Sequence, residues 1–265
     1  YSSAASDVYK RQDWNLSIML MIVAFGFIAS FVDSVVGGGG LISTPALLAV
    51  GLPPSVALGT NKFASSFSTL TSALKFLRSG KVDLKIVGKM FPLIFVASGG
   101  GAIIATYIPA NILKPLIIIA LSLVLIYTII QKDWGNVRTF TDFTFTKAVL
   151  FTLIFIVIGF YDGFLGGGTG SFMLFTLLLF GFDFLSAAGN AKVLNFASNC
   201  GALLFFMILG QVNYFYGIIM ASSMMIGALL GAQFALKKGV RYVKALFIVV
   251  TAILIIKNLY DFIVQ

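Results

Sequence analysis

The sequence predicts an all-α, polytopic membrane protein of about eight transmembrane helices in two repeats of four. Two observations lead to this fold class. Hydrophobic residues make up 59% of the 265 residues and charged residues only 10%, which is more apolar surface than one soluble core can bury. The second observation is a polar signature that occurs twice, in which an aspartate is followed by a glycine cluster, an asparagine and a lysine. A signature of this kind at matching positions indicates a duplicated membrane protein.

The two copies of the signature are nearly the same length. The first contains Asp33, Gly37–Gly40, Asn61 and Lys62, and the second contains Asp162, Gly166–Gly168, Gly170, Asn190 and Lys192. The positions of aspartate and lysine differ by 62 − 33 = 29 in the first copy and by 192 − 162 = 30 in the second. Beyond the lysines the numbering of the two halves keeps a constant offset of 192 − 62 = 130, so the second copy has one insertion between aspartate and lysine.

Eight apolar windows are long enough to cross a bilayer, which takes about 20 helical residues. They run near 14–36, 55–77, 86–108, 110–131, 147–165, 185–209, 214–236 and 242–263. Two further apolar segments, 41–50 and 171–181, follow the glycine clusters and are too short to span. We expect them to be glycine-hinged half-helices, because broken helices at matching positions of two repeats are typical of transporter binding sites.

The repeat also predicts how the chain divides. We expect residues 1–12 to be a non-native or disordered leader, 13–131 the first transmembrane repeat, 132–146 a linker and 147–265 the second repeat. Basic residues cluster at 75–89 and again at 237–244. Since basic loops face the cytoplasm, both clusters lie on the same side only if each half-helix changes the crossing parity. We therefore favour inverted repeats.

The charged and reactive residues limit the function classes. The net charge is +9, but Lys and Arg fall between the apolar spans, which indicates membrane topology rather than nucleic-acid binding. The chain has no His and a single Cys, Cys200, so neither a disulfide nor a His-based metal site is expected. We predict no cofactor and no metal.

Lys62 and Lys192 are the strongest candidates for a function. Each lies about 10 Å inside a predicted helix, and a charge at the bilayer centre costs about 2.5–3.5 kcal/mol. A single lysine at this depth can snorkel to the headgroups. Two lysines at equivalent positions, each after a glycine break, instead predict a polar cavity that binds an anion.

The glycine clusters and amides complete the predicted site. Glycines let the backbone expose N–H groups, and each half-helix would present the positive end of its dipole; the same glycines would equally serve close helix packing or a hinge. If buried, each aspartate either pairs with a lysine or carries a proton during transport, and if it lies at the interface it is a plain helix-end charge. We predict Lys62, Lys192, Asn61, Asn190, Asn195, Gly38, Gly39, Gly167, Gly168 and Thr169 as substrate-binding residues, with Asp33 and Asp162 in coupling or proton transfer.

Four motifs taken together resemble the TauE/SafE family of bacterial permeases. They are Asp-x-x-x-Gly-Gly-Gly-Gly at 33–40, Thr60-Asn61-Lys62, Asp162 with the glycines at 166–170, and Ala-Lys-Val-Leu-Asn-Phe at 191–196. The resemblance covers nearly the whole chain after residue 13. It implies an inner-membrane secondary carrier that exports sulfur-containing anions such as sulfite or organosulfonates. One departure is Asn190, where the second copy in the family more often has Thr before Ala-Lys.

We therefore expect a secondary transporter of small sulfur-containing anions that works by alternating access. The alternatives are a passive anion channel, which the same basic lining would serve, and a membrane receptor subunit without flux. An intramembrane enzyme is disfavoured, because only the two aspartates remain as candidate acids. The expected partners are the small anion and membrane lipids, with no nucleic acid, and assembly into a homo-oligomer is left open.

Overall fold

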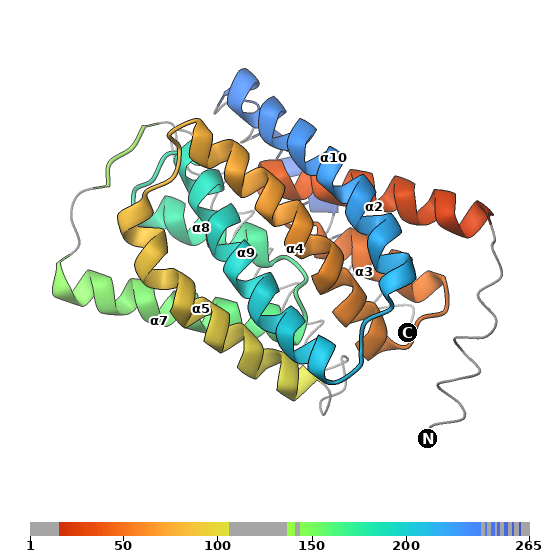
Figure 1. Cartoon of the computed structure of the whole chain (residues 1–265). Coiled ribbons are helices and arrows are strands. Elements are labelled where there is room, and N and C mark those ends of the chain that lie inside the picture. The colour runs from red at the N-terminus through yellow and green to blue at the C-terminus, as the bar shows by residue number, and fades with distance from the viewer. Residues whose placement is uncertain are drawn as a thin grey trace.

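The computed structural model describes residues 16–105, 137–140 and 144–239, together with separate positions between 242 and 260. Within these residues the regular structure is entirely helical (Figure 1). In chain order the helices are α2 (Leu16–Val36), α3 (Gly40–Ala49), α4 (Pro54–Arg78), α5 (Leu84–Ala105), α7 (Phe145–Phe164), α8 (Thr169–Leu179), α9 (Phe184–Ile208) and α10 (Tyr214–Lys238).

Five of these helices, α2, α5, α7, α9 and α10, are long and apolar enough to cross a membrane. Helix α4 is as long as α9, at 25 residues, but it carries a run of Ser, Thr, Asn and Lys that makes it more polar. The chain is thus a multi-pass helical membrane protein, as predicted. The predicted span 110–131 lies outside the described residues, and 242–263 lies largely outside them.

The described helices follow the same order of lengths twice, long, short, long, long. The first positions of α4 and α9 differ by 184 − 54 = 130, and those of α5 and α10 differ by 214 − 84 = 130. The short helices have 10 and 11 residues, and they lie where half-helices were predicted. The single insertion between the two copies therefore falls inside the second short helix.

The long helices form two groups of three. Each group contains two helices from one half of the chain and one helix from the other half. Helix α10 packs beside α2 and α4, and α5 packs beside α7 and α9. Glycines allow the close contacts within each group. A Cβ added at Gly227 would overlap the backbone oxygen of Phe27, and one added at Gly163 would overlap that of Ser98. Small residues at these positions let neighbouring backbones touch.

Helices α4 and α9 join the two groups at the centre of the molecule, where they run side by side in opposite directions (Figure 1). The start of α4 lies at the end of α9, since a Cβ at Gly59 would meet Gln211. The start of α9 lies at the end of α4, since a Cβ at Gly189 would meet Lys81. Both lysines of the polar signature are on these two helices.

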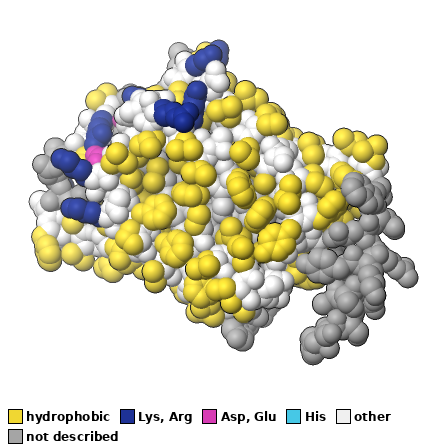
Figure 2. Space-filling view, viewed as in Figure 1, with side chains coloured by type: hydrophobic (Ala, Val, Ile, Leu, Met, Phe, Trp, Pro, Cys, Tyr) yellow, Lys and Arg dark blue, Asp and Glu magenta, His cyan; other side chains and the backbone are white. Residues whose placement is uncertain are grey.

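The visible basic side chains gather at one end of the molecule (Figure 2). Helix α4 ends there with Lys75 and Arg78 in its last turn, and α10 ends with Lys237 and Lys238 in its last turn. Figure 2 shows the surface between the two ends covered mainly with hydrophobic side chains. A basic end and an apolar girdle are expected of a protein that crosses a bilayer with one end in the cytoplasm.

Candidate functional site

Glycines end the first long helix of each half. After α2, Gly37 and Gly38 have φ of +85° and +88°, and after α7, Gly166 and Gly168 have φ of +72° and +84°. Residues with a Cβ rarely adopt these left-handed conformations, so the backbone leaves the helix and begins a short helix within a few residues. The predicted helix breaks are therefore present at both glycine clusters.

The two breaks lie directly against each other. A Cβ added at Gly37 would overlap the carbonyl carbon of Gly170, and one added at Gly40 would lie 2.8 Å from the oxygen of Gly166. The hydroxyl of Ser171 donates a hydrogen bond of 3.2 Å to the backbone oxygen of Val36 across the same contact. The N-terminal ends of α3 and α8 therefore meet in the interior, which brings the two predicted anion-binding elements together.

Two buried ion pairs flank this meeting point. Lys62 Nζ on α4 lies 2.7 Å from Asp162 Oδ2 at the end of α7, and Lys192 Nζ on α9 lies 2.6 Å from Asp33 Oδ2 near the end of α2. The Lys62 and Asp162 side chains are each 2% exposed. Each lysine thus pairs with the aspartate of the other half of the chain.

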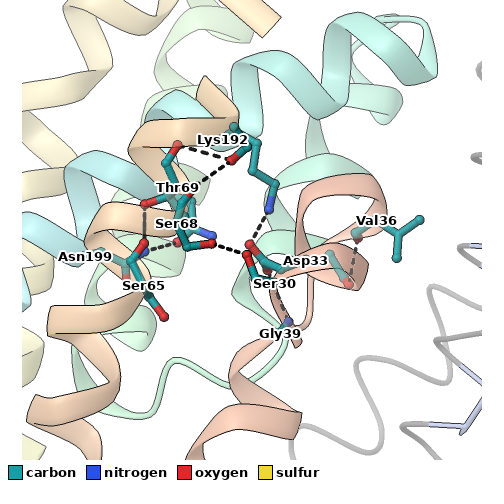
Figure 3. A network of polar contacts seen from close by, with 12 residues as sticks. Ser30, Asp33, Val36, Gly39, Ser65, Ser68, Thr69, Lys192 and Asn199 are labelled. Carbon is teal, nitrogen blue, oxygen red and sulfur yellow. Dashed lines mark hydrogen bonds and ion pairs between the residues drawn. The ribbon is translucent and has the colours of Figure 1, made fainter. Parts of the chain in front are cut away.

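The aspartates accept further hydrogen bonds. Asp33 Oδ1 accepts from the backbone N–H of Gly39 at 3.1 Å, inside the first glycine break, and Figure 3 shows this bond beside the contact with Lys192. Asp162 Oδ2 accepts from the hydroxyl of Ser198. Charged groups out of water need such partners, and here both carboxylates are held by a lysine and by one more donor.

Amides extend the network around Lys62. Its ammonium donates to Asn199 Oδ1 at 3.2 Å, and Asn199 Nδ2 donates to Asn195 Oδ1 at 3.1 Å. Asn61 Oδ1 accepts from the hydroxyl of Ser43 at 2.6 Å, which ties α4 to the short helix α3. Neutral groups that both donate and accept therefore surround the ion pairs.

A small polar cavity lies between the ion pairs and the glycine breaks. Its volume is about 20 Å³, which is room for little more than one water molecule. Lys62 lines this cavity and Lys192 does not. The lining residues are Asp33, Gly38, Gly39, Gly40, Asn61, Lys62, Ser65, Thr69, Asp162, Gly166, Gly170, Asn195, Asn199 and Met224.

The structure brings most of the predicted site residues together. Seven of them line the cavity, namely Asp33, Gly38, Gly39, Asn61, Lys62, Asp162 and Asn195. Lys192 reaches the site through Asp33. Gly167, Gly168 and Thr169 lie in the second glycine break without lining the cavity, and the Thr169 hydroxyl is buried with no hydrogen-bond partner among the described residues.

Ser198 is a site residue that the prediction omitted. It binds Asp162, and it also accepts at its backbone oxygen a hydrogen bond of 2.7 Å from the hydroxyl of Ser98. A sequence signal for it exists, because 198 − 130 = 68 and Ser68 is the matching residue of the first half. Asn199 also lines the cavity, and its spacing of four residues from Asn195 already indicates from the sequence that both lie on the same face of α9.

Asn190 lies away from the cavity and stabilises a loop instead. Its Oδ1 accepts from the backbone N–H of Asp83 at 2.9 Å, and its Nδ2 donates to the oxygen of Ser186 at 2.7 Å. In the first half, Thr60 Oγ1 accepts from the backbone N–H of Asn213 at 2.9 Å. The two hydrogen bonds are equivalent, since 190 − 60 = 130 and 213 − 83 = 130. Asn190 therefore binds the loop after α4 as Thr60 binds the loop after α9. This explains why Asn can replace Thr at this position.

An apolar helical bundle with two charge pairs at its centre defines a multi-pass membrane protein with a buried polar site, the arrangement found in secondary transporters. The chain belongs to the family described as Sulfite exporter TauE/SafE, whose match covers residues 22–258. The family confirms the predicted resemblance.

Relatives from several organisms carry transporter names. A "Probable membrane transporter protein ORF9" of Sinorhizobium sp is 36% identical over 255 residues, which is 94% of this chain and 95% of that protein. A "Probable membrane transporter protein" of Haemophilus influenzae is 34% identical over 253 residues, covering 94% of this chain and 97% of its own. No solved structure matches the chain. By its family and relatives the protein is a membrane transporter and not an enzyme.

Proposed function

We propose that this protein exports a small sulfur-containing oxyanion, such as sulfite or an organosulfonate, across the bacterial inner membrane by alternating access. The observation that carries the proposal is the cavity at the crossing of the two glycine breaks, with Lys62 and two aspartates in its wall. The family description names sulfite export. A relative from Arabidopsis thaliana, 28% identical over 137 residues, is called "Sulfite exporter TauE/SafE family protein 6"; the match covers 51% of this chain and 32% of that protein.

The ion pairs favour coupling between the anion and a proton. Two lysines and two aspartates give the centre no net charge, so an anion gains little unless one carboxylate is neutralised or displaced. If Asp162 takes up a proton, the ammonium of Lys62 is released to the anion while Asn199 still accepts one of its three N–H groups. Asp162 then acts in coupling and Lys62 in binding.

The size of the cavity favours a carrier over an open channel. A sulfur oxyanion is larger than the single water molecule for which the cavity has room, so the two glycine breaks must separate before it can bind. Short helices that begin at glycine breaks are suited to such movement. A passive channel would instead need a continuous polar path, and the polar groups described above gather around one small cavity.

We further propose eight spans in two inverted repeats, with the basic end in the cytoplasm. The antiparallel course of α4 and α9 supports this topology (Figure 1). So does the charge distribution, since the loop after α4 contains Lys81 whereas the matching loop 209–213 after α9 contains no charged residue. Positive loops collected on one side are the expected result of an inverted pair.

The test is uptake of radiolabelled sulfite and of a sulfonate into proteoliposomes at several pH values. We expect saturable flux that is faster under counter-exchange, and loss of most flux in Lys62→Ala. A matched control is Lys237→Ala, which removes one exposed positive charge at the end of α10 and should leave the flux unchanged. Flux that rises linearly with concentration would support the channel instead. No flux of either anion, with folded protein in the membrane, would refute the proposed substrate class.

Asp162→Asn separates binding from coupling. The amide cannot titrate, so we expect the pH dependence of flux to be lost while counter-exchange between labelled and unlabelled anion continues. If the variant keeps the pH profile of the unmodified protein, Asp162 is not the coupling group.

A further inference from the structure

A second cleft lies beside the first turns of α5 and α7, apart from the polar centre. Its volume is about 400 Å³, within the usual range of ligand sites. The residues that line it are Asp83, Lys85, Ile86, Lys89, Met90, Phe140, Ala148, Phe151 and Thr152. None of them belongs to the polar centre, so transport as proposed above gives this cleft no role.

The cleft is basic at its rim and apolar at its floor. Lys85 and Lys89 lie four residues apart and hence on one face of α5, and both are exposed. No ion pair to either lysine is found among the described residues. The floor is formed by Phe151, which is 1% exposed, and by the partly buried Met90. Such a site suits a ligand with an anionic head and an apolar tail.

One acidic group also lies at the cleft, and it is already neutralised. The Asp83 carboxylate lies 3.1 Å from Arg138 Nη2, and the guanidinium of Arg138 lies 4.9 Å from the centre of the Phe182 ring. Asp83 therefore opposes an incoming anion less than a free carboxylate would. The two lysines of the rim remain available.

The surface beside the cleft is apolar and belongs to α7, one of the helices that are long and apolar enough to cross a membrane. On α7, Val149, Leu150 and Leu153 are 42%, 52% and 56% exposed. All three lie within about three turns of the start of the helix, at the depth where headgroups meet acyl chains. An acyl chain can continue from the floor of the cleft over this surface, whereas a free phosphate ion would use only the rim.

We propose that this cleft binds an anionic phospholipid, with its phosphate on Lys85 and Lys89 and an acyl chain against Phe151 and Met90. Basic pockets between membrane helices at the cytoplasmic side bind headgroups of this kind. The lipid would join α5 to α7, two helices that come from different halves of the chain.

The experiment measures the lipid that the purified, full-length protein retains from mixed phosphatidylglycerol and phosphatidylcholine vesicles, by native mass spectrometry. We expect preferential retention of phosphatidylglycerol, and about 25-fold weaker retention in the Lys85→Gln/Lys89→Gln double variant, since each basic residue near an anionic lipid gives about a five-fold gain. The matched control, Lys237→Gln/Lys238→Gln, removes the same charge from the same end and should retain lipid as the unmodified protein does.

A second variant tests the apolar half of the site. Ala148→Phe fills the cleft without changing any charge, and it should also release the lipid. The proposal is overturned if the two double variants lose lipid equally, if phosphatidylglycerol is not preferred, or if excess inorganic phosphate displaces the bound lipid, which would indicate a phosphate site. These measurements involve no transport, so their outcome does not depend on the proposed anion flux.

Discussion

Replacing Lys62 by Met should expose the cost of separating a buried ion pair. The substitution keeps much of the side-chain volume but leaves the Asp162 carboxylate, 2% exposed, with the Ser198 hydroxyl as its remaining partner. Removing one member of a buried pair costs about 3–5 kcal/mol. Each kcal/mol corresponds to roughly 2–4 °C in a chain of this size, so we expect Tm to fall by about 6–20 °C.

Removing both members of the same pair should restore most of that loss. In Lys62→Met/Asp162→Leu neither charge is left buried, and such replacements are often neutral. The mismatched double variant, Lys62→Met/Asp33→Leu, leaves Asp162 and Lys192 without their partners and should be at least as unstable as the single variant. The comparison thus tests the pairing between the two halves of the chain, which composition alone does not determine.

Thermal unfolding can be followed with a dye that fluoresces on reaction with a thiol. Cys200 is the single cysteine of the chain, and it lies on α9 eight residues after Lys192, so it reports on the helix of interest. A Tm for Lys62→Met within about 2 °C of the unmodified protein would refute the reasoning, because the carboxylate would then not be buried in an unpaired state. Equal rescue by the matched and mismatched doubles would refute the specific pairing.

Three further predictions concern the first glycine break and the contacts of Asp83. Gly37→Ala should reduce the yield of folded protein, because it combines a positive φ with an overlap of backbone atoms, a strain of about 1–3 kcal/mol before the overlap is counted; Gly88→Ala, a helical position with open space, should be neutral or stabilising in the same expression assay. Asn190→Thr should leave Tm unchanged since it keeps an acceptor for the Asp83 N–H, whereas Asn190→Leu should lower stability by about 1–3 kcal/mol in the thiol-dye assay. Arg138→Gln should cost less than about 1 kcal/mol, because the guanidinium is 41% exposed and its pair with Asp83 is screened; a larger loss of Tm would show that this segment holds α8 in place.

The hinges and the lysines could be predicted from the sequence because their signals are local. Four glycines within five residues interrupt the apolar sequence at both breaks, whereas the run of three at 99–101 stays inside α5. A lysine within an apolar window is conspicuous. The partners of the lysines could not be predicted, because the positions of Lys62 and Asp162 differ by 162 − 62 = 100 and the two side chains meet only when α4 and α7 both pack against α9. Within one copy the aspartate and lysine are the nearest candidates for a pair, and the structure pairs them across copies instead.

The prediction treated Asn61 and Asn190 as members of the same pattern, and the constant offset shows that they are not equivalent. Asn190 matches Thr60, and Asn61 matches Ala191. Their side chains accordingly differ in environment, one in the wall of the cavity and the other at the loop before α5. A strict alignment at the constant offset would have separated them, whereas a search for residue types near a lysine groups them.

Crossed pairing has a mechanical consequence for a transporter whose halves move against each other. Each ion pair spans the two halves, so a movement that separates the glycine breaks must also strain or break a lysine–aspartate contact. Breaking it in a dry interior would cost several kcal/mol, unless the anion replaces the carboxylate at Lys62 and a proton neutralises Asp162. Binding of both substrates would then supply the free energy that opens the site, while the unloaded protein would stay closed. Under the proposed mechanism, the carrier would therefore couple the movement of the anion to that of the proton without leaking either ion.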